Sequence, residues 1–599
     1  MKLKINNDCC VCSFCYRACA VDAPYYDGEQ VQIDQSKCVG CGKCLKACPM
    51  GAIYDEDNPP QAPVLHETTR LDCDALILGA GGAGMVAAVR IAEATGKKVI
   101  VLEKAKRTGS GALHVAGGLR LFDTQWEKDA GAEEMCEEYV KVALNTSHYE
   151  FDKQLVENSF RALPRFFDWF CTWTNAHEKF ELVKGRNGRL TVDSKSLRPD
   201  SPWFHNAGEY IMTQLFKRAK ELGVEVLHET PAKEFILDNG GQVVGVKAQD
   251  PGGEVEVTCR ACLVATGSLL LGDVIKRVLP DYADAYMPRF AHAINVYTGD
   301  GVTMCEKAGI PIDYDNICVA FTGNLVMPCD AMTVEYGQAT GKRPLMPTDL
   351  RPHANRPEAL MVNQNGERWI NEQYCGTIFY RLLKQPQCVS YTIMDEATIK
   401  SKPMKKKPLY VDSGLGRATP MAVPGPGEEP NPANVLGGMP FEEKAEWNDD
   451  TMQWIANLKN KHLVIADTLE ELAEKTEIPY KTLKQTIDHY NSLCAKVHDD
   501  DFLKDPDYLV PIRKGPYYAI RTFLMSDGAQ GGLFIDANMQ VKGKDGLMKG
   551  LYAAGDTTSG RLVNKGGQKI QTINDYTWAV GSGMVAAASI IAQLTTAAV

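Results

Sequence analysis

The clearest pattern of hydrophobic positions lies between residues 71 and 103. An uninterrupted apolar run at 75–78 predicts a buried strand, the alanine-rich segment after Gly84 predicts a helix, and residues 98–102 predict a second buried strand. Residues 467–494 show helical periodicity after a capping start, which predicts a packed pair of helices. Strands that alternate with a helix are typical of α/β proteins.

A longer apolar stretch runs from Trp578 to the C-terminus and has the length of a membrane span. It contains small and hydroxyl residues, no basic cluster flanks it, and it follows a cofactor-type motif. These features favour a buried closing helix, so we expect no membrane span.

The turn between the two predicted strands carries the chemistry of a dinucleotide site. It reads Gly79-x-Gly81-x-x-Gly84, with Gly82 inside it, and the second strand ends in Glu103. Glycines let the backbone approach a pyrophosphate, the N-terminus of the helix stabilises its charge, and the acid binds the ribose. Two later segments, 261–268 and 549–560, resemble the strands with which FAD-binding folds return to their cofactor. The resemblance implies FAD more than NAD, with contacts from Ala265, Thr266, Gly267, Gly555 and Asp556.

Cysteine spacing marks a separate N-terminal module. One run, Cys38, Cys41, Cys44 and Cys48, has the spacing of bacterial ferredoxins, and an upstream run repeats it at Cys9, Cys12, Cys15 and Cys19. Because the fourth cysteine of each run binds the other cluster, we expect one [4Fe–4S] cluster on Cys9, Cys12, Cys15 and Cys48. We expect the second on Cys38, Cys41, Cys44 and Cys19.

Other uses of these cysteines fit less well. Structural zinc sites use CxxC pairs that stand far apart, and no signal peptide precedes the first run, which argues against a disulfide framework. We therefore expect a reduced, cytoplasmic protein. Cysteines beyond residue 60, including Cys259 and Cys262, are expected to fill core or strand positions.

Composition narrows the choice of partners. The 599 residues are 44% hydrophobic and 24% charged, which are ordinary globular values with room for three or four domains. The formal net charge is −11, and no basic stripe with interleaved aromatic residues is present, so we expect no nucleic acid partner. The partner should be a small molecule or a protein.

From about Leu71 onward the chain resembles the fumarate reductase and succinate dehydrogenase flavoprotein superfamily, in segments 103–118, 298–309, 360–372 and 531–556. That superfamily also contains ketosteroid dehydrogenases, urocanate reductases and adenylylsulfate reductase subunits. The resemblance implies an α/β fold in which a Rossmann-like FAD-binding domain carries an inserted α+β capping domain. The expected divisions are a two-[4Fe–4S] ferredoxin domain at 1–60, a linker at 61–71, the FAD-binding domain at 72–314 and 521–599, and the capping domain at 315–520.

The same resemblance adds five FAD contacts, Lys104, Ser110, Gly111, Gly117 and Gly118. In the membrane-bound branch a histidine links the flavin covalently, and here Gly111 stands at that position. The resemblance therefore implies noncovalent FAD.

Four substrate-contact positions of the fumarate reductases are changed. Their capping-domain arginine falls near Gly376, a histidine before the glycine pair at 531–532 is absent, another histidine falls on 318–321, and only Lys565 remains as a nearby cation in the last motif. These changes imply a substrate other than fumarate. The polar groups left near the expected cleft are the catalytic candidates, with Tyr374 and Lys565 first, followed by Arg381, Arg356, His353 and Tyr380.

The whole chain is expected to pass electrons from a reduced carrier or partner redox protein through both clusters to FAD, which reduces an activated C=C bond of a small organic substrate. Two alternatives stay open. One is a dehydrogenase that exports electrons through the clusters, and the other is a noncatalytic electron-relay subunit of a larger redox complex.

Overall fold

The computed structural model describes part of every expected domain. The described residues are 1–7, 9, 14–27, 30–48, 51–59, 63–106, 121–146, 152–184, 190–194, 207–269, 273–278, 297–324, 350, 353–373, 382, 384–404, 447–457, 461–558 and 575–596.

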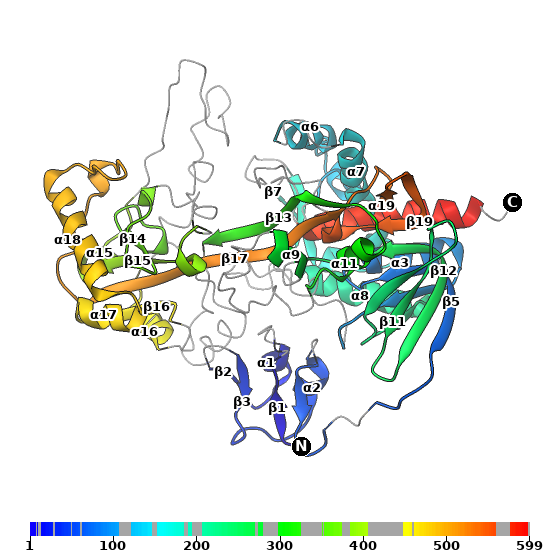
Figure 1. Ribbon diagram of the computed structural model, residues 1–599, viewed down its shortest axis with the longest axis horizontal. Helices are drawn as coiled ribbons and strands as arrows, with labels where there is room; N and C mark the ends of the chain where they lie inside the picture. Colours follow the sequence, from blue (N-terminus) through cyan, green and yellow to red (C-terminus); the bar gives the residue numbers. More distant parts are fainter. Residues whose placement is uncertain are drawn as a thin grey trace.

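The nucleotide-binding part is built on an eight-stranded sheet (Figure 1). Its parallel strands are β12 (Glu254–Val264), β5 (Thr69–Leu78), β6 (Val99–Leu102) and β9 (Glu225–Leu227), and β19 (Gly546–Ala553) pairs in parallel with the end of β12. Antiparallel strands β10 (Ala232–Leu237), β11 (Val243–Gln249) and β18 (Gln540–Gly543) complete it. Both predicted strands are confirmed, and β5 begins earlier than predicted because it pairs with β12 from Thr69 onward.

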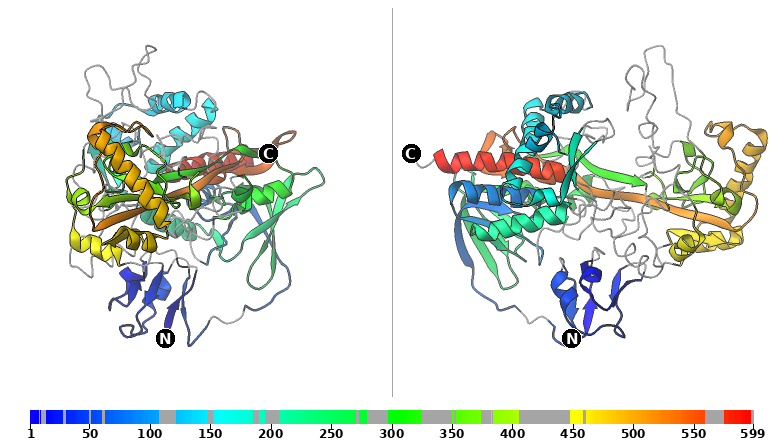
Figure 2. Two further views of the ribbon diagram at one scale, coloured as in Figure 1. Left: turned by 60° about the vertical axis from the view of Figure 1, so that its left-hand side comes forward. Right: turned by 180° about the vertical axis from the view of Figure 1, so that it is seen from behind.

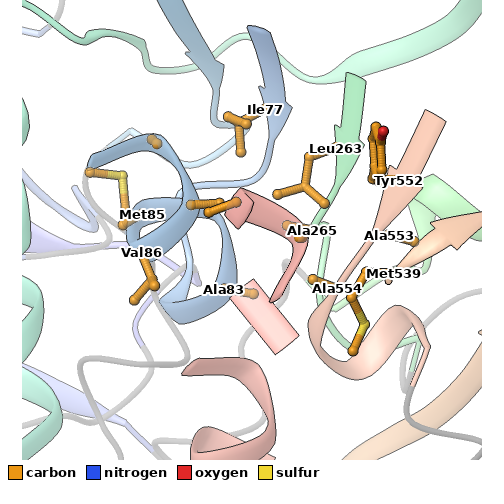
Figure 3. Close-up of a cluster of buried hydrophobic side chains, with 14 of the residues drawn as sticks. Ile77, Ala83, Met85, Val86, Leu263, Ala265, Met539, Tyr552, Ala553 and Ala554 are labelled. Atoms are coloured by element: carbon orange, nitrogen blue, oxygen red, sulfur yellow. The ribbon is translucent and has the colours of Figure 1, made fainter. Parts of the chain in front are cut away.

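Helix α3 (Gly82–Thr95) connects β5 to β6 and packs against α8 (Ala207–Glu221) and α19 (Asp575–Thr596). Buried side chains fill the space between α3 and the sheet, and Figure 3 shows Ile77 of β5, Leu263 of β12 and Ala83 of α3 within this cluster. The remaining elements on this side are α5 (Gln125–Asp129), α6 (Cys136–Thr146), α7 (Lys153–Cys171), β7 (Phe180–Lys184), β8 (Leu190–Ser194), α9 (Asp273–Val278) and α11 (Asp300–Lys307).

The C-terminal helix α19 lies against α3 and α7 through small residues (Figure 2). An ideal Cβ on Gly583 would stand 2.6 Å from the Ala83 carbonyl oxygen, and one on Gly581 would stand 3.0 Å from that of Ser159. Of the described helices, α19 is the one with the length and hydropathy of a membrane span, a weak signal because core helices share both properties. Its close packing on two helices agrees with the predicted closing helix.

The cap lies at the opposite end of the molecule and is joined to the FAD side by two long strands (Figure 1). Strand β17 (Tyr517–Leu533) pairs with β15 (Val389–Asp395) and β16 (Leu463–Ala466) in its first half and with β13 (Ile312–Asn324) in its second half. The predicted boundaries at 314/315 and 520/521 therefore fall inside continuous strands. Strand β14 (Leu360–Asn363) and helices α15 (Glu396–Lys400), α16 (Asp449–Ala456), α17 (Leu469–Thr476) and α18 (Tyr480–Lys496) complete the cap. The last two helices confirm the predicted pair.

The N-terminal module consists of two small antiparallel pairs and two short helices. Strand β1 (Leu3–Ile5) pairs with β4 (Ile53–Asp55), and β2 (Pro24–Tyr26) pairs with β3 (Val31–Ile33), while α1 (Phe14–Ala18) and α2 (Lys43–Ala47) lie beside each other. Its apolar residues belong to one hydrophobic core with residues of the cap, including Met452, Ile455 and Tyr518. The module therefore shares its hydrophobic core with the cap, and it lies below the middle of the molecule in Figure 1.

The connector between the module and the FAD domain is fixed near its end. The backbone N–H of His66 donates to the Gly252 carbonyl oxygen (3.1 Å), and its imidazole Nε2 lies 2.8 Å from Asp250 Oδ1. An ideal Cβ on Gly252 would stand 2.6 Å from the imidazole, so the hairpin that joins β11 to β12 needs glycine there to accept the ring.

Candidate functional site

Three loops meet at the carboxyl ends of the parallel strands β5, β12 and β19. They are the glycine-rich turn at 79–84, the segment 265–267, and the short 3-10 helix η7 (Gly555–Thr557). Backbone hydrogen bonds join the strand ends, from Ala265 N–H to Leu78 O (2.9 Å) and from Ala554 N–H to Val264 O (3.0 Å). Ligands of open α/β sheets bind at this edge.

The glycine turn is tightly packed on one side and open on the other. An ideal Cβ on Gly79, where φ is 105°, would stand 2.3 Å from Ala265 O, and one on Gly84 would stand 2.0 Å from Gly79 O. A Cβ on Gly81 would meet nothing within 4 Å, and Gly81 begins α3 without a side-chain cap. The open face of Gly81 and the N-terminus of α3 thus fit the pyrophosphate of a dinucleotide.

Glu103 lies at the end of β6, where the ribose-binding acid was predicted. It is buried, and its two carboxylate oxygens accept hydrogen bonds from the backbone N–H groups of Ala80 (2.9 Å) and Ala105 (2.8 Å). These bonds hold the carboxylate beside the glycine turn, and each oxygen keeps a lone pair for a ribose hydroxyl. Lys104 instead donates to Thr298 Oγ1 and, at 2.8 Å, to Asp300 Oδ2, so it anchors the start of α11 to the end of β6.

The two return loops are held by α19 and by each other. Ser582 Oγ accepts a hydrogen bond from Gly555 N–H (3.0 Å), and the Trp578 indole N–H donates to Gly555 O (3.1 Å). The Thr557 hydroxyl lies 3.4 Å from Gly267 O, the residue after Thr266, and Asp556 is half-buried in η7. These segments therefore lie together at the strand ends, as predicted, and their contacts with FAD stay a prediction.

Tyr576 is a residue of this site that the sequence reasoning missed. Its ring edge lies against Gly82, since an ideal Cβ there would stand 2.9 Å from Tyr576 Cε2. The hydroxyl is buried, and no described residue hydrogen-bonds to it. A polar aromatic residue at the start of an otherwise apolar helix was the available signal, and a buried hydroxyl without a protein partner is a candidate contact for a ligand.

Several predicted site residues lie outside the described residues. They are the FAD contacts Ser110, Gly111, Gly117 and Gly118, the cluster ligand Cys12, and the catalytic candidates Tyr374, Tyr380, Arg381 and Lys565. Their assignments stay predictions.

The predicted ligands of the second cluster lie together in the N-terminal module. Burial raises the pKa of the Cys44 thiol to about 11, with smaller effects from the neighbouring thiols of Cys19, Cys38 and Cys41. The grouping of Cys19 with the later run is the crossed arrangement that the spacing predicts. Of the predicted ligands of the first cluster, Cys15 and Cys48 are buried and Cys9 is half-buried.

In the described part of the chain, no three His, Cys, Asp or Glu side chains are set closely enough for a single metal ion. The Cys19, Cys38, Cys41 and Cys44 thiols nonetheless act on one another. Each cysteine of a [4Fe–4S] cluster binds a different iron, so the sulfurs stand farther apart than around one ion. The four thiols around Cys44 therefore suit a cluster by their number and type.

Two catalytic candidates in the cap are interior residues. Arg356 pairs with Glu358 (2.7 Å) and donates to the carbonyl oxygens of Ile399 (2.8 Å) and Ser401 (2.7 Å), which engages its whole guanidinium group. His353 is fully buried against Trp447, and burial lowers the pKa of its imidazole to about 3. These placements favour structural roles for both residues.

The charged residues of the segment 368–372 form a buried network. Arg368 donates to both oxygens of Glu372 (3.0 and 2.9 Å) and to both oxygens of Asp499 (3.0 and 2.8 Å). Lys504 Nζ lies 3.1 Å from Glu372 Oε2 and donates to the Tyr490 hydroxyl (2.9 Å). The network fixes residues 368–372, two positions before Tyr374.

Sequence comparisons agree with this architecture. A family described as an FAD binding domain matches residues 74–567, and a family described as a 4Fe-4S binding domain matches residues 31–54. The first match covers most of the chain. The chain belongs to the FAD-binding family of fumarate reductase and succinate dehydrogenase flavoproteins.

Individual relatives of this flavoprotein family are distant. A vinyl phenol reductase from Lactiplantibacillus plantarum is 24% identical over 504 residues, which cover 81% of this chain and 90% of the relative. An NADH:fumarate oxidoreductase from Klebsiella pneumoniae is 23% identical over 492 residues, and the matched part is 81% of this chain but 44% of that protein. The open conformation of a flavocytochrome c3 fumarate reductase has a TM-score of 0.60 at 20% identity, covering 88% of this chain and 79% of the other.

These findings establish the fold and the general chemistry. The fold is the α/β FAD-binding fold with an N-terminal 4Fe-4S region. The flavoprotein is an FAD-dependent oxidoreductase that acts on CH–CH bonds, in a family of C=C reductases.

Proposed function

We propose that this flavoprotein takes electrons from a reduced carrier through two [4Fe–4S] clusters and saturates an activated C=C bond of a small organic substrate other than fumarate. The observation that carries the proposal is a contact between the two cofactor-binding parts. An ideal Cβ on Gly51, three residues after Cys48, would stand 2.8 Å from Cδ of Lys106, three residues after Glu103. A cluster loop thus touches the strand-end segment that follows the ribose-binding acid.

When bound, the clusters supply one-electron transfer and FAD supplies hydride transfer to carbon. The chain holds the dinucleotide with the open turn at Gly81, the N-terminus of α3 and the Glu103 carboxylate. It holds the clusters with two sets of four cysteines, Cys9, Cys12, Cys15 and Cys48, and Cys38, Cys41, Cys44 and Cys19. FAD is held noncovalently, because Gly111 replaces the linking histidine of the membrane-bound branch.

The substrate class follows from the residues that replace the carboxylate-binding groups. The positions near Gly376, at 318–321 and before Gly531 lack the expected arginine and histidines, so little remains to hold two carboxylates. The name of one relative gives vinyl phenol, an alkene with no carboxylate, as its substrate. We propose an activated alkene with at most one carboxylate. We also propose a cytoplasmic setting, since its cysteines would stay reduced there.

The proposal is tested with anaerobically purified protein whose iron, sulfide and FAD contents are measured first. The protein is reduced, and vinyl phenol, acrylate, urocanate and fumarate are added one at a time while flavin absorbance is followed. Reoxidation by one of the first three compounds, with recovery of the saturated product, is the expected result. Absence of reoxidation by every compound, in protein with both cofactors intact, would favour an exporting dehydrogenase or a relay subunit.

The proton donor is tested separately. Tyr374→Phe should slow turnover while FAD remains bound, because the substitution removes only the acidic hydroxyl. Tyr480→Phe is the matched control, since that hydroxyl is exposed on α18 and bonds to Glu470. Unchanged turnover in Tyr374→Phe would remove that residue from the mechanism.

A further inference from the structure

The duplicated cysteine runs end in two loops of the same geometry. In the first, the Ala23 N–H donates to Cys19 Sγ (3.4 Å), and in the second, the Ala52 N–H donates to Cys48 Sγ (3.3 Å). The residue before each alanine has a left-handed backbone, with φ of 48° at Asp22 and 61° at Gly51. The loops after Cys19 and Cys48 therefore have the same local geometry, and they differ in the residues that surround them.

The Cys48 loop faces the FAD domain. The Lys106 side chain lies across Gly51, with Cδ and Cβ at 2.8 and 3.2 Å from an ideal Cβ there, and Gly51 N–H donates to Cys48 O (3.3 Å). A side chain at Gly51 would push Lys106 away, so the glycine brings the loop close to the segment after β6. By the crossed pattern, Cys48 belongs to the cluster site of Cys9, Cys12 and Cys15.

The Cys19 loop faces solvent instead. Ala20, Val21 and Asp22 are all exposed, and so is Cys41, another ligand of the same cluster site. Val39, between Cys38 and Cys41, is 68% exposed. An exposed apolar side chain beside two cluster ligands leaves this site open to a partner.

The N-terminus adds to this surface. An ideal Cβ on Gly40 would stand 2.9 Å from Met1 O, and one on Gly42 would stand 2.8 Å from Met1 Cε, so Met1 covers the loop of Cys38 and Cys41. Met1 itself is 55% exposed. The docking face is defined as Met1, Val21, Val39, Lys37 and Lys43.

The docking face carries positive charge on a chain whose net charge is −11. Lys43 is exposed, and Lys37 is exposed and only loosely paired, at 3.9 Å from Asp34. Two lysines beside exposed apolar groups suit an acidic protein, because they offset the repulsion that the rest of the chain exerts on it.

We infer that the cluster site of Cys38, Cys41, Cys44 and Cys19 receives electrons from an acidic one-electron redox protein at the docking face, and that the site containing Cys48 passes them to FAD. The inference rests on the proposed function, since it requires both clusters. Each docked carrier is oxidised by one electron, and two such events supply the two electrons that, with two protons, saturate one C=C bond.

The test removes one cluster site at a time in the full-length protein. Cys41→Ala removes the site of Cys38, Cys41, Cys44 and Cys19, and Cys9→Ala removes the site that contains Cys48. EPR spectra identify the cluster that remains in each variant. Reduced bacterial ferredoxin is then added. In Cys9→Ala the ferredoxin should still reduce the remaining cluster, while flavin absorbance stays oxidised. In Cys41→Ala the ferredoxin should no longer reduce the remaining cluster, although dithionite does.

The opposite pattern in the two variants would overturn the assigned order. The failure of the proposed function looks different, because it is seen in the unmodified protein. Iron and sulfide for only one cluster, or clusters that are reduced without any reduction of FAD, would defeat the function itself.

A second experiment leaves every cysteine in place. The double variant Lys37→Glu and Lys43→Glu should slow cluster reduction by ferredoxin roughly tenfold at low ionic strength, and added salt should narrow the difference. Reduction by dithionite should not change. Lys220→Glu with Lys233→Glu, at exposed positions of the FAD domain, is the matched control. Equal rates for the two double variants would exclude the docking face.

Discussion

Replacing Glu372 with glutamine tests whether the buried charge network holds the cap together. The carboxylate is fully buried and accepts hydrogen bonds from Arg368, from the backbone N–H of Met361 (3.1 Å) and from Lys504 (3.1 Å). Burial alone would raise the pKa of Glu372, but Lys504 and Arg368 lower it below its ordinary value, so the group is charged when folded. The substitution keeps the shape and removes the charge.

The size of the destabilisation follows from the partners that Arg368 and Lys504 keep in the variant. Arg368 keeps Asp499 as a partner, whereas the described structure gives the fully buried Lys504 no second carboxylate within ion-pair distance. Lys504 would retain only neutral acceptors, which are the Ala359 carbonyl oxygen (2.7 Å), the Tyr490 hydroxyl and the amide oxygen of the new glutamine. Removing one partner of a buried ion pair destabilises a protein by about 3–5 kcal/mol. We expect Glu372→Gln to lower the free energy of unfolding of the cap by that amount.

Hydrogen exchange measures the effect in the intact protein. Amides of α17 and α18 report the opening of the cap, and amides of α3 in the nucleotide-binding domain serve as an internal reference. The matched control is Asp488→Asn, which breaks an exposed pair with Lys484 (2.7 Å) and should change the cap by less than about 0.5 kcal/mol. If both variants shift the α17 and α18 amides equally, the network does not stabilise the cap.

Three further predictions concern single groups. Burial lowers the pKa of His353 and of His462 to about 3. Below about pH 6.5 the unfolded chain therefore binds more protons than the folded one, and the cap becomes less stable as the pH falls, by about 1.4 kcal/mol per pH unit for each histidine. His353→Phe should halve that slope in urea unfolding, and an unchanged slope would contradict the assignment. Tyr576→Phe should stabilise the FAD-free protein by about 1–2 kcal/mol, since it removes a buried unbonded hydroxyl, and should weaken FAD binding about tenfold in titrations. Equal FAD affinity would show that the hydroxyl does not contact the cofactor. The Glu67 carbonyl and the Asp250 carboxylate raise the pKa of His66. The stabilisation that the charged imidazole gives the connector is therefore fully present below the ordinary pKa of histidine, and it is lost as the pH rises through the raised pKa. Proteolysis of the connector should accelerate above neutral pH, and a rate independent of pH would refute this hold.

The elements that the sequence predicted well depend on local spacing. The turn at Gly79 and Gly81 requires glycine because backbone atoms approach this turn closely, and the short glycine motif in the sequence is enough to predict it. The spacing within each cysteine run is equally local, whereas the exchange of the fourth cysteines between the runs stays a prediction from the ferredoxin pattern. Burial of Glu103 beside the turn also follows from its place at the end of a strand.

Features that depend on packing between distant segments were not predictable in this way. His353 and Arg356 are polar residues in the segment expected to border the cleft, yet both side chains are almost completely buried inside the cap. Burial of a polar group depends on partners such as Glu358 and Trp447, and nothing in the local sequence identifies them. The contact of Gly51 with Lys106 joins two domains, and it could not be predicted because nothing in either local segment identifies the other.

The core that the N-terminal module shares with the cap means that the module is not a detachable cassette. Deleting residues 1–60 would remove the module's part of that shared core and expose apolar cap residues to water, and such a surface promotes aggregation. A version of this flavoprotein without the module would therefore need polar replacements at the cap positions that the module covers. Substitutions in the module and in the cap are therefore constrained together, because the two parts share one hydrophobic core.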